Sequence, residues 1–209
     1  MKESEISWLQ FDKRLLFVLL TAIFILLIFL RTTLIESETA LVQVWEEDGK
    51  AGVLHLFNGL SYLGVPLFLL AKVTLVACGL WIASFGIGYR LTFDSLWRII
   101  LLGQTVFVLP EVLRILYFLV TPGDPSYYEV RDFFPLSLGQ VTQGYPEYYA
   151  YALKRLNLFE LFYWVYLTLM VHRLARKKWA FALLIVILGY LLPFLLWVGY
   201  SVLPPSAAS

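Results

Sequence analysis

The sequence has little of what soluble enzymes and metalloproteins depend on. Charged residues make up only 15% of its 209 positions, and it holds one cysteine, Cys78, and two histidines. A single cysteine excludes an internal disulfide and a cysteine-based metal cluster, and Cys78 fits a small apolar residue inside a span. The formal net charge of +1 gives no reason to expect nucleic acid as a partner.

Signatures of catalysis are also missing. No HExxH or comparable ligand spacing occurs, and His55 and His172 fall on opposite sides of the membrane in the topology below, so we expect no metal. Ser61, Ser84 and Thr74 have no nearby histidine, and the chain has no GxSxG motif or phosphate-binding glycine loop. We therefore expect neither an enzyme nor a cofactor-binding protein.

Long hydrophobic runs are what the sequence does have. Hydrophobic residues make up 60% of the chain and its mean hydropathy is +0.77, which is typical of an integral membrane protein with the lipid bilayer as a partner. Run length predicts an all-α, polytopic membrane helix bundle, a single domain over 1–209. Its five transmembrane spans are expected at about 15–30, 63–87, 96–120, 156–171 and 179–203.

The first run, LLFVLLTAIFILLIFL, has the competing interpretation of a cleaved signal peptide. Because its apolar core is long and no small-x-small cleavage site follows, we interpret it as a retained span. The connector before the third span carries a helix start signal, since Thr92 or Asp94 can cap a helix beginning near Ser95.

Two long segments, 32–62 and 121–155, are predicted as outer loops with interfacial character. In the first, the spacing of Val42, Trp45, Val53 and Phe57 suits short helices lying at the interface. The second is rich in Tyr, Pro and Gly, and tyrosine rings prefer the headgroup level. The same aromatic content also fits a docking surface for a partner protein.

Basic residues predict the orientation. With the N-terminus inside and the C-terminus outside, the longer list of Lys and Arg falls in the short inner segments, as the positive-inside rule requires. The inner residues are Lys2, Lys13, Arg14, Arg90, Arg98, Arg173, Arg176, Lys177 and Lys178. The outer residues are Arg31, Lys50, Arg131, Lys154 and Arg155.

Four ionisable residues remain inside the predicted spans, and we call them the charged layer: Lys72, Glu111, Arg114 and Glu160. Since the spans alternate in direction and each residue rises about 1.5 Å, all four fall at similar depth in the outer half. Glu111 and Arg114 are three apart and share a helix face, and Pro110 before them predicts a kink.

Two acids and two bases at one depth suggest a pairing hypothesis, Lys72 with Glu111 and Arg114 with Glu160. One interpretation of the charged layer is structural, because paired charges lock helix packing. The others are a proton or ion path, or a polar pocket for a lipid headgroup. In the second span, Gly79 also permits close approach of another helix, by internal packing more often than by dimerisation.

Two stretches carry a resemblance to a known family: LGVPLFLLAKVTLVACGLWIASFGIGYRLTFDSLWRII and NLFELFYWVYLTLMVHRLARKKWAFALLIVILGYLLPFLLWV. Over about residues 60–203 the chain resembles the Yip-domain family of five-span membrane proteins, in which an Asn-Leu-Phe start of the fourth span and a short basic turn before the last are typical. The resemblance implies five spans and a cytoplasmic N-terminus, and it brings no catalytic residues. The link of eukaryotic members to Rab GTPases is not carried over, because this chain has almost no cytoplasmic domain.

The expected function is that of a non-enzymatic integral membrane protein that organises or assists a membrane complex or the bilayer. Its expected partner is another membrane protein or a second copy of itself, and its expected location is the bacterial inner membrane. The alternative is a small transporter or permease component that uses the charged layer as its path. An intramembrane enzyme is disfavoured, because no nucleophile and base pair up.

Overall fold

A computed structural model describes residues 11–36, 51–121, 123, 125–141, 147–176 and 178–202, and every regular element in this part of the chain is a helix. The elements are α1 (Lys13–Leu34), α3 (Ala51–Gly86), α4 (Phe93–Gly103), η4 (Gln104–Phe107), α5 (Val108–Val120), α6 (Tyr127–Asp132), α7 (Leu138–Val141), α8 (Glu147–Arg155), α9 (Leu158–Ala175), α10 (Trp179–Val186), η5 (Ile187–Leu191) and α11 (Leu192–Ser201). The all-α fold class is therefore confirmed.

Four helical stretches of the described chain are long and apolar enough to cross a membrane: Lys13–Leu34, Gly59–Gly86, Phe93–Val120 and Trp179–Ser201. Such stretches are characteristic of an integral membrane protein. The predicted fourth span corresponds to α9, which has 18 residues and includes Glu160 and Arg173, and it is not among the four.

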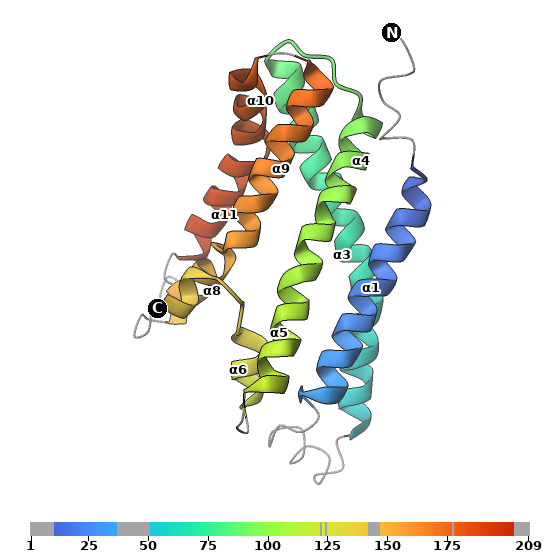
Figure 1. Ribbon diagram of the computed structural model, residues 1–209, viewed down its shortest axis with the longest axis vertical. Coiled ribbons are helices and arrows are strands. Elements are labelled where there is room, and N and C mark those ends of the chain that lie inside the picture. The colour runs from blue at the N-terminus through green and yellow to red at the C-terminus, as the bar shows by residue number, and fades with distance from the viewer. Residues whose placement is uncertain are drawn as a thin grey trace, which may run out of the picture.

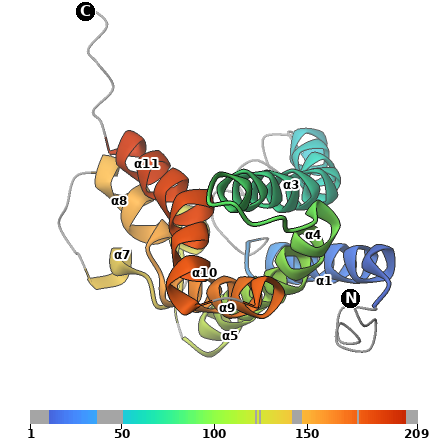
Figure 2. The ribbon, with the colours of Figure 1, turned by 90° about the horizontal axis from the view of Figure 1, so that it is seen from above.

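The long helices run alongside one another as a bundle (Figure 1), with α1 at one side and α8 and α11 at the other (Figure 2). Helix α1 lies at the edge, because only 6% of its apolar window is buried, against 44% for Phe93–Val120. An apolar core joins α3, α4, α9 and α10, and we call it the packed core. Its fully buried members include Val73, Leu80, Ile99, Ile100, Tyr163, Leu167 and Ile185.

Within the packed core, close packing depends on Gly103 at the end of α4. A Cβ atom there would lie 2.6 Å from the Tyr166 ring and 2.7 Å from the Tyr163 ring. Gln104 is 1% exposed, and its Nε2 donates to the Tyr163 hydroxyl at 3.0 Å. The Tyr166 hydroxyl donates to the Ile99 carbonyl oxygen at 2.8 Å, so these polar groups are satisfied inside the core.

Helix α3 is longer than the sequence predicted. It begins at Ala51, whereas the span was expected from about 63, so residues 51–62 of the predicted outer loop are helical. Residues 37–50 of that loop, with Val42 and Trp45, lie outside the described residues, and its first residues extend α1 to Leu34. The stretch AGVLHLFNGLSY contains no proline, so a helix nucleated in the apolar run can propagate through it.

The third predicted span consists of α4, the 3₁₀ turn η4 and α5. Thr92 caps α4 by accepting from the Ser95 backbone N–H at 3.4 Å, so the predicted start signal operates through Thr92. Pro110 is buried in the first turn of α5, where a missing N–H breaks no bond of that helix. The change of helix type falls at Gln104–Phe107, just before the predicted kink.

The last predicted span also changes helix type, because η5 is a π-helical turn between α10 and α11. Pro193 lacks the N–H that would reach the Gly189 carbonyl four residues earlier. That carbonyl oxygen faces α3, and a Cβ atom on Gly79 would lie only 2.1 Å from it. The small residue Gly79 therefore serves internal packing, at a backbone-to-backbone crossing of α3 and η5.

The predicted outer loop 121–155 holds three short helices, α6, α7 and α8. Ser126 caps α6 in a reciprocal capping box with Glu129. An isolated antiparallel bridge joins Ser137 to Asn157 and draws this segment onto the start of α9. At this end of the bundle α6 and α8 lie beside α5 and α11 (Figure 1).

Candidate functional site

The four residues of the charged layer line a single cavity of about 710 Å³, which we call the charged cavity. Lys72 comes from α3, Glu111 and Arg114 from α5, and Glu160 from the first turn of α9. Helix α11 adds to the lining through Pro193, Phe194 and Trp197. The structure thus brings together, at one site, residues that the sequence spreads over three helices.

Arg114 and Glu111 form an ion pair within α5, with Arg114 Nη1 3.3 Å from Glu111 Oε2. The same Glu111 oxygen lies 3.5 Å from Nη1 of Arg31, in the last turn of α1. Arg31 also binds Glu36, whose Oε1 accepts from its Nε at 2.9 Å. The Glu111 carboxylate therefore pairs with two guanidinium groups, Arg114 of α5 and Arg31 of α1.

Glu160 is occupied by uncharged donors. Its Oε1 accepts from the Tyr190 hydroxyl in η5 and from Trp164 Nε1, the latter at 3.1 Å. The Glu160 backbone N–H donates to the side chain of Asn157, which caps α9, at 2.8 Å. These bonds hold Glu160, which is 6% exposed, with its carboxylate shared between α9 and the last span.

Lys72 has aromatic rather than acidic contacts. Its Nζ lies 3.7 Å from the centroid of the Phe107 ring and 5.9 Å from that of Tyr163, in cation–π geometry. Among the described side chains, Lys72 forms no ion pair or hydrogen bond. The hypothesised pairs Lys72–Glu111 and Arg114–Glu160 are therefore not formed, and each acid has other partners.

Arg114 is 7% exposed and incompletely satisfied. Its Nη1 binds Glu111, and its guanidinium carbon lies 5.6 Å from the Phe134 ring centroid. Its Nε is buried and has no hydrogen-bond partner. Leaving a buried donor without a hydrogen bond costs free energy, so this arrangement favours the binding of an acceptor from outside the chain.

Four further charged residues belong to this site although the sequence did not single them out there: Arg31, Asp132, Lys154 and Arg155. The guanidinium of Arg155 lies 5.0 Å from the Tyr151 ring centroid and 5.4 Å from that of Trp197. Lys154 Nζ lies 3.0 Å from Asp132 Oδ1. The available signal was their position, because Lys154 and Arg155 immediately precede the helix that carries Glu160.

One face of α3 explains the shape of the cavity. Phe68, Lys72, Leu75 and Val76 follow helical spacing on this face, and Gly79 continues it. At Gly79 this face touches η5. Toward the start of α3, the helices α3 and α11 run apart (Figure 1). Phe68 is 66% exposed and Leu75 71%, so the cavity opens sideways through an apolar rim.

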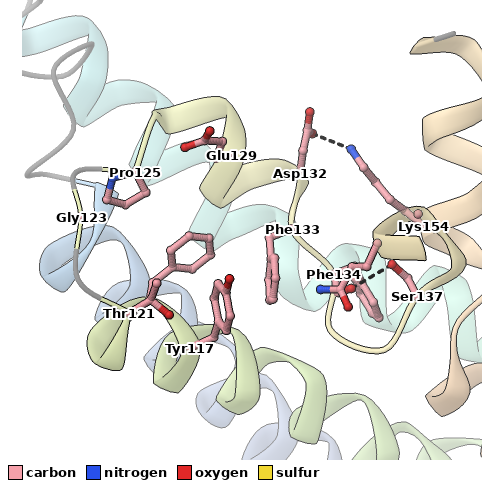
Figure 3. A pocket seen from close by; sticks show the side chains of 13 residues that line it. Tyr117, Thr121, Gly123, Pro125, Glu129, Asp132, Phe133, Phe134, Ser137 and Lys154 are labelled. Carbon is pink, nitrogen blue, oxygen red and sulfur yellow. Dashed lines mark hydrogen bonds and ion pairs between the residues drawn. The ribbon is translucent and has the colours of Figure 1, made fainter. Parts of the chain in front are cut away.

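A second cavity of about 540 Å³ is lined by residues of α5, α6, α7 and α8 and of the segments that join them (Figure 3). Its lining includes Tyr117 and Phe133, whose rings stack at 4.4 Å. Asp132, Phe134 and Lys154 line both cavities, and the ion pair of Asp132 with Lys154 is seen at the edge of this second one. These three residues form the partition between the two spaces.

Among the described residues, no group of three or more His, Cys, Asp and Glu side chains is placed to hold a metal ion. His172 instead stacks on Trp179, with ring centroids 4.3 Å apart. Comparison of the chain with protein-family models, with curated proteins and with solved structures gives no match. The class that fold and site define is a helical membrane protein with a charged cavity that opens sideways.

Proposed function

We propose that this chain is a non-enzymatic integral membrane protein that holds an amphipathic molecule of the bilayer in the charged cavity and so assists a membrane complex or the bilayer. The observation that carries this proposal is the pairing of a charged lining, with Lys72 and Arg114, and an exposed apolar rim, with Phe68 and Leu75. A molecule with a polar head and an apolar tail matches both parts.

Five spans with the N-terminus inside belong to the same proposal, with α9 as the fourth. Helix α9 packs against α4 and α10, with Leu161, Phe162 and Val165 exposed on its outer face, while its ionisable Glu160 is buried. The start of α1, α4 and the end of α9, which carry Lys13, Arg98 and Arg173, lie at one end of the bundle (Figure 1). The end of α1 and α8, which carry Arg31 and Arg155, lie toward the other. This distribution supports that orientation. A bacterial inner membrane and a likeness to the Yip-domain family belong to the same proposal.

Cysteine labelling in a Cys78→Ser background tests the topology. Lys178→Cys, before α10, is expected to be labelled only from the cytoplasmic side, and Thr121→Cys, after α5, only from the outside; both native residues are exposed. Labelling of both positions from the same side would overturn the five-span arrangement.

Native mass spectrometry of the full chain in mild detergent tests the proposed occupant. We expect the purified protein to retain a bound amphiphile, and Ala71→Trp, which fills the cavity from α3, to lose it. Ala180→Trp is the matched control, because Ala180 is also an exposed alanine on a candidate span but lies outside the cavity. Equal retention by a folded Ala71→Trp protein would overturn the proposal.

A second candidate function is a small transporter component, and the shared partition favours it. Asp132, Phe134 and Lys154 separate two cavities, so their displacement would join the spaces into one route. Charge-dependent flux in proteoliposomes that Ala71→Trp abolishes supports transport. A stoichiometric protein partner that co-purifies, with no flux, supports the assembly role instead.

A further inference from the structure

The charged cavity has an imbalance between its acids and its bases. Both acids of the charged layer are occupied, Glu111 by two guanidinium groups and Glu160 by Tyr190 and Trp164. Among the described residues Lys72 forms no ion pair or hydrogen bond, although the Glu160 charge acts on it from beyond ion-pair distance, and Arg114 Nε has no acceptor. The two lining groups left without a hydrogen-bond acceptor among the described residues, Lys72 Nζ and Arg114 Nε, are both cationic, and they favour an anionic ligand.

The imbalance persists when the other charged lining residues are included. Lys154 is paired with Asp132, whereas Arg155 lies against the rings of Tyr151 and Trp197 and its Nη2 donates to the Tyr151 hydroxyl at 3.0 Å. The lining thus adds a further cation and no further unpaired acid. Basic side chains that meet in an enclosed, partly apolar space favour an anion strongly, because the low dielectric weakens charge interactions less than water does.

The side opening indicates how the anion arrives. Between Phe68 and Gly79 one face of α3 passes from an exposed apolar rim to a backbone contact with η5. Trp197 on α11 faces the same cavity and is 49% exposed. In a bilayer this rim meets acyl chains, so a tail can stay outside the bundle while the attached headgroup enters.

We infer that the charged cavity binds the anionic phosphate headgroup of a membrane lipid, with Lys72 and Arg114 as its cationic contacts and the acyl chain leaving between α3 and α11. This inference rests on the proposed function and adds the chemical class of the occupant. Arg114 supplies a guanidinium that donates through more than one N–H, and Lys72 a mobile point charge, a combination suited to phosphate oxygens.

Titration of the delipidated full chain with single lipids tests this inference, followed by native mass spectrometry. The probes are phosphatidylglycerol, diacylglycerol with the same acyl chains, and inorganic phosphate. We expect phosphatidylglycerol to bind about tenfold or more tightly than diacylglycerol, because charge-assisted hydrogen bonds are lost without the phosphate. Inorganic phosphate alone is expected to bind far more weakly, because it gains nothing at the apolar rim.

Variants at Lys72 assign the preference to the cavity. Lys72→Met should reduce the phosphatidylglycerol preference about tenfold, and Lys72→Arg, which keeps the charge, should retain most of it. Lys178→Met is the matched control, because it removes an exposed cation at the other end of the bundle. The wild-type headgroup preference gives a readout that does not depend on the folding of any variant.

The outcomes separate this inference from the proposed function. Equal binding of diacylglycerol and phosphatidylglycerol, both blocked by Ala71→Trp, overturns the phosphate headgroup and leaves the amphiphile-binding role standing. Binding of inorganic phosphate as tightly as the lipid overturns the lipid source and retains the anion site. Failure of every lipid to bind a folded wild-type protein overturns both proposals.

Discussion

The face of α3 that meets the last span has a packed half around Gly79 and an open half toward Phe68. The two halves differ in whether their polar groups have partners within the chain. At Gly79 and in the packed core, contacts are backbone to backbone or ring to ring, and buried polar groups such as Gln104 have partners. Toward Phe68 the same face lines an open space in which Lys72 forms no ion pair among the described residues and Arg114 Nε lacks an acceptor. The packed half around Gly79 and Gln104 is closed by contacts within the chain, whereas on our proposal a ligand completes the open half.

The largest effect is expected where the two halves meet. Gly79→Ala places a Cβ atom 2.1 Å from the Gly189 carbonyl oxygen, and because the obstacle is backbone, the helices themselves must move apart. We expect destabilisation above about 3 kcal/mol, beyond the usual range for overpacking, with loss of monodisperse protein in detergent. Thermal unfolding followed by size-exclusion chromatography measures both.

Gly64→Ala is the control on the same helix, because a Cβ atom at Gly64 meets no atom within 4 Å. It should be neutral or slightly stabilising, since alanine favours the helix over glycine. Equal unfolding temperatures of Gly64→Ala and Gly79→Ala would show that the crossing of α3 and η5 at Gly79 does not close the cavity at that end.

A smaller but diagnostic effect is expected in the open half. Glu111→Gln leaves Arg114 and Arg31 without their shared carboxylate, at a cost of about 3 kcal/mol, the low end for a broken buried pair because the Glu111 side chain is 23% exposed. If an anionic lipid occupies the cavity, phosphatidylglycerol should recover part of this loss and diacylglycerol should not. Thermal unfolding in detergent with each lipid is the measurement.

Much of the fold followed from the sequence because bundle architecture depends on hydrophobic run length. The all-α class and the apolar character of four spans needed only composition and length. The meeting of Lys72, Glu111, Arg114 and Glu160 at one cavity is consistent with depth counted along alternating helices. The depth of a residue along a helix axis depends only on its position in the span, so it can be counted from the sequence.

The partners of those residues could not be obtained in the same way, because pairing depends on how each helix is rotated about its axis. Lys72 of α3 turns to Phe107 of η4, and Glu160 of α9 turns to Tyr190 of η5. A third contact, the crossing of α3 and η5 at Gly79 and Gly189, depends on helix rotation in the same way. The π-helical turn behind that crossing has no periodicity signal of its own. Pro193 was its only local sign.

The smallest loss of stability is expected in the packed core. It shows whether lipid stabilises only the charged cavity or the whole bundle. Gln104→Leu removes the donor to the Tyr163 hydroxyl, which is fully buried, and should cost about 1 kcal/mol, as interhelical hydrogen bonds in membrane proteins do. Thr105→Val, at the exposed neighbouring position, should cost less. Because neither Gln104 nor Tyr163 lines the charged cavity, the loss in Gln104→Leu should be the same with phosphatidylglycerol, with diacylglycerol and with neither. A loss that phosphatidylglycerol recovers as fully as in Glu111→Gln would mean that lipid stabilises the whole bundle, and the distinction between the two halves would not hold.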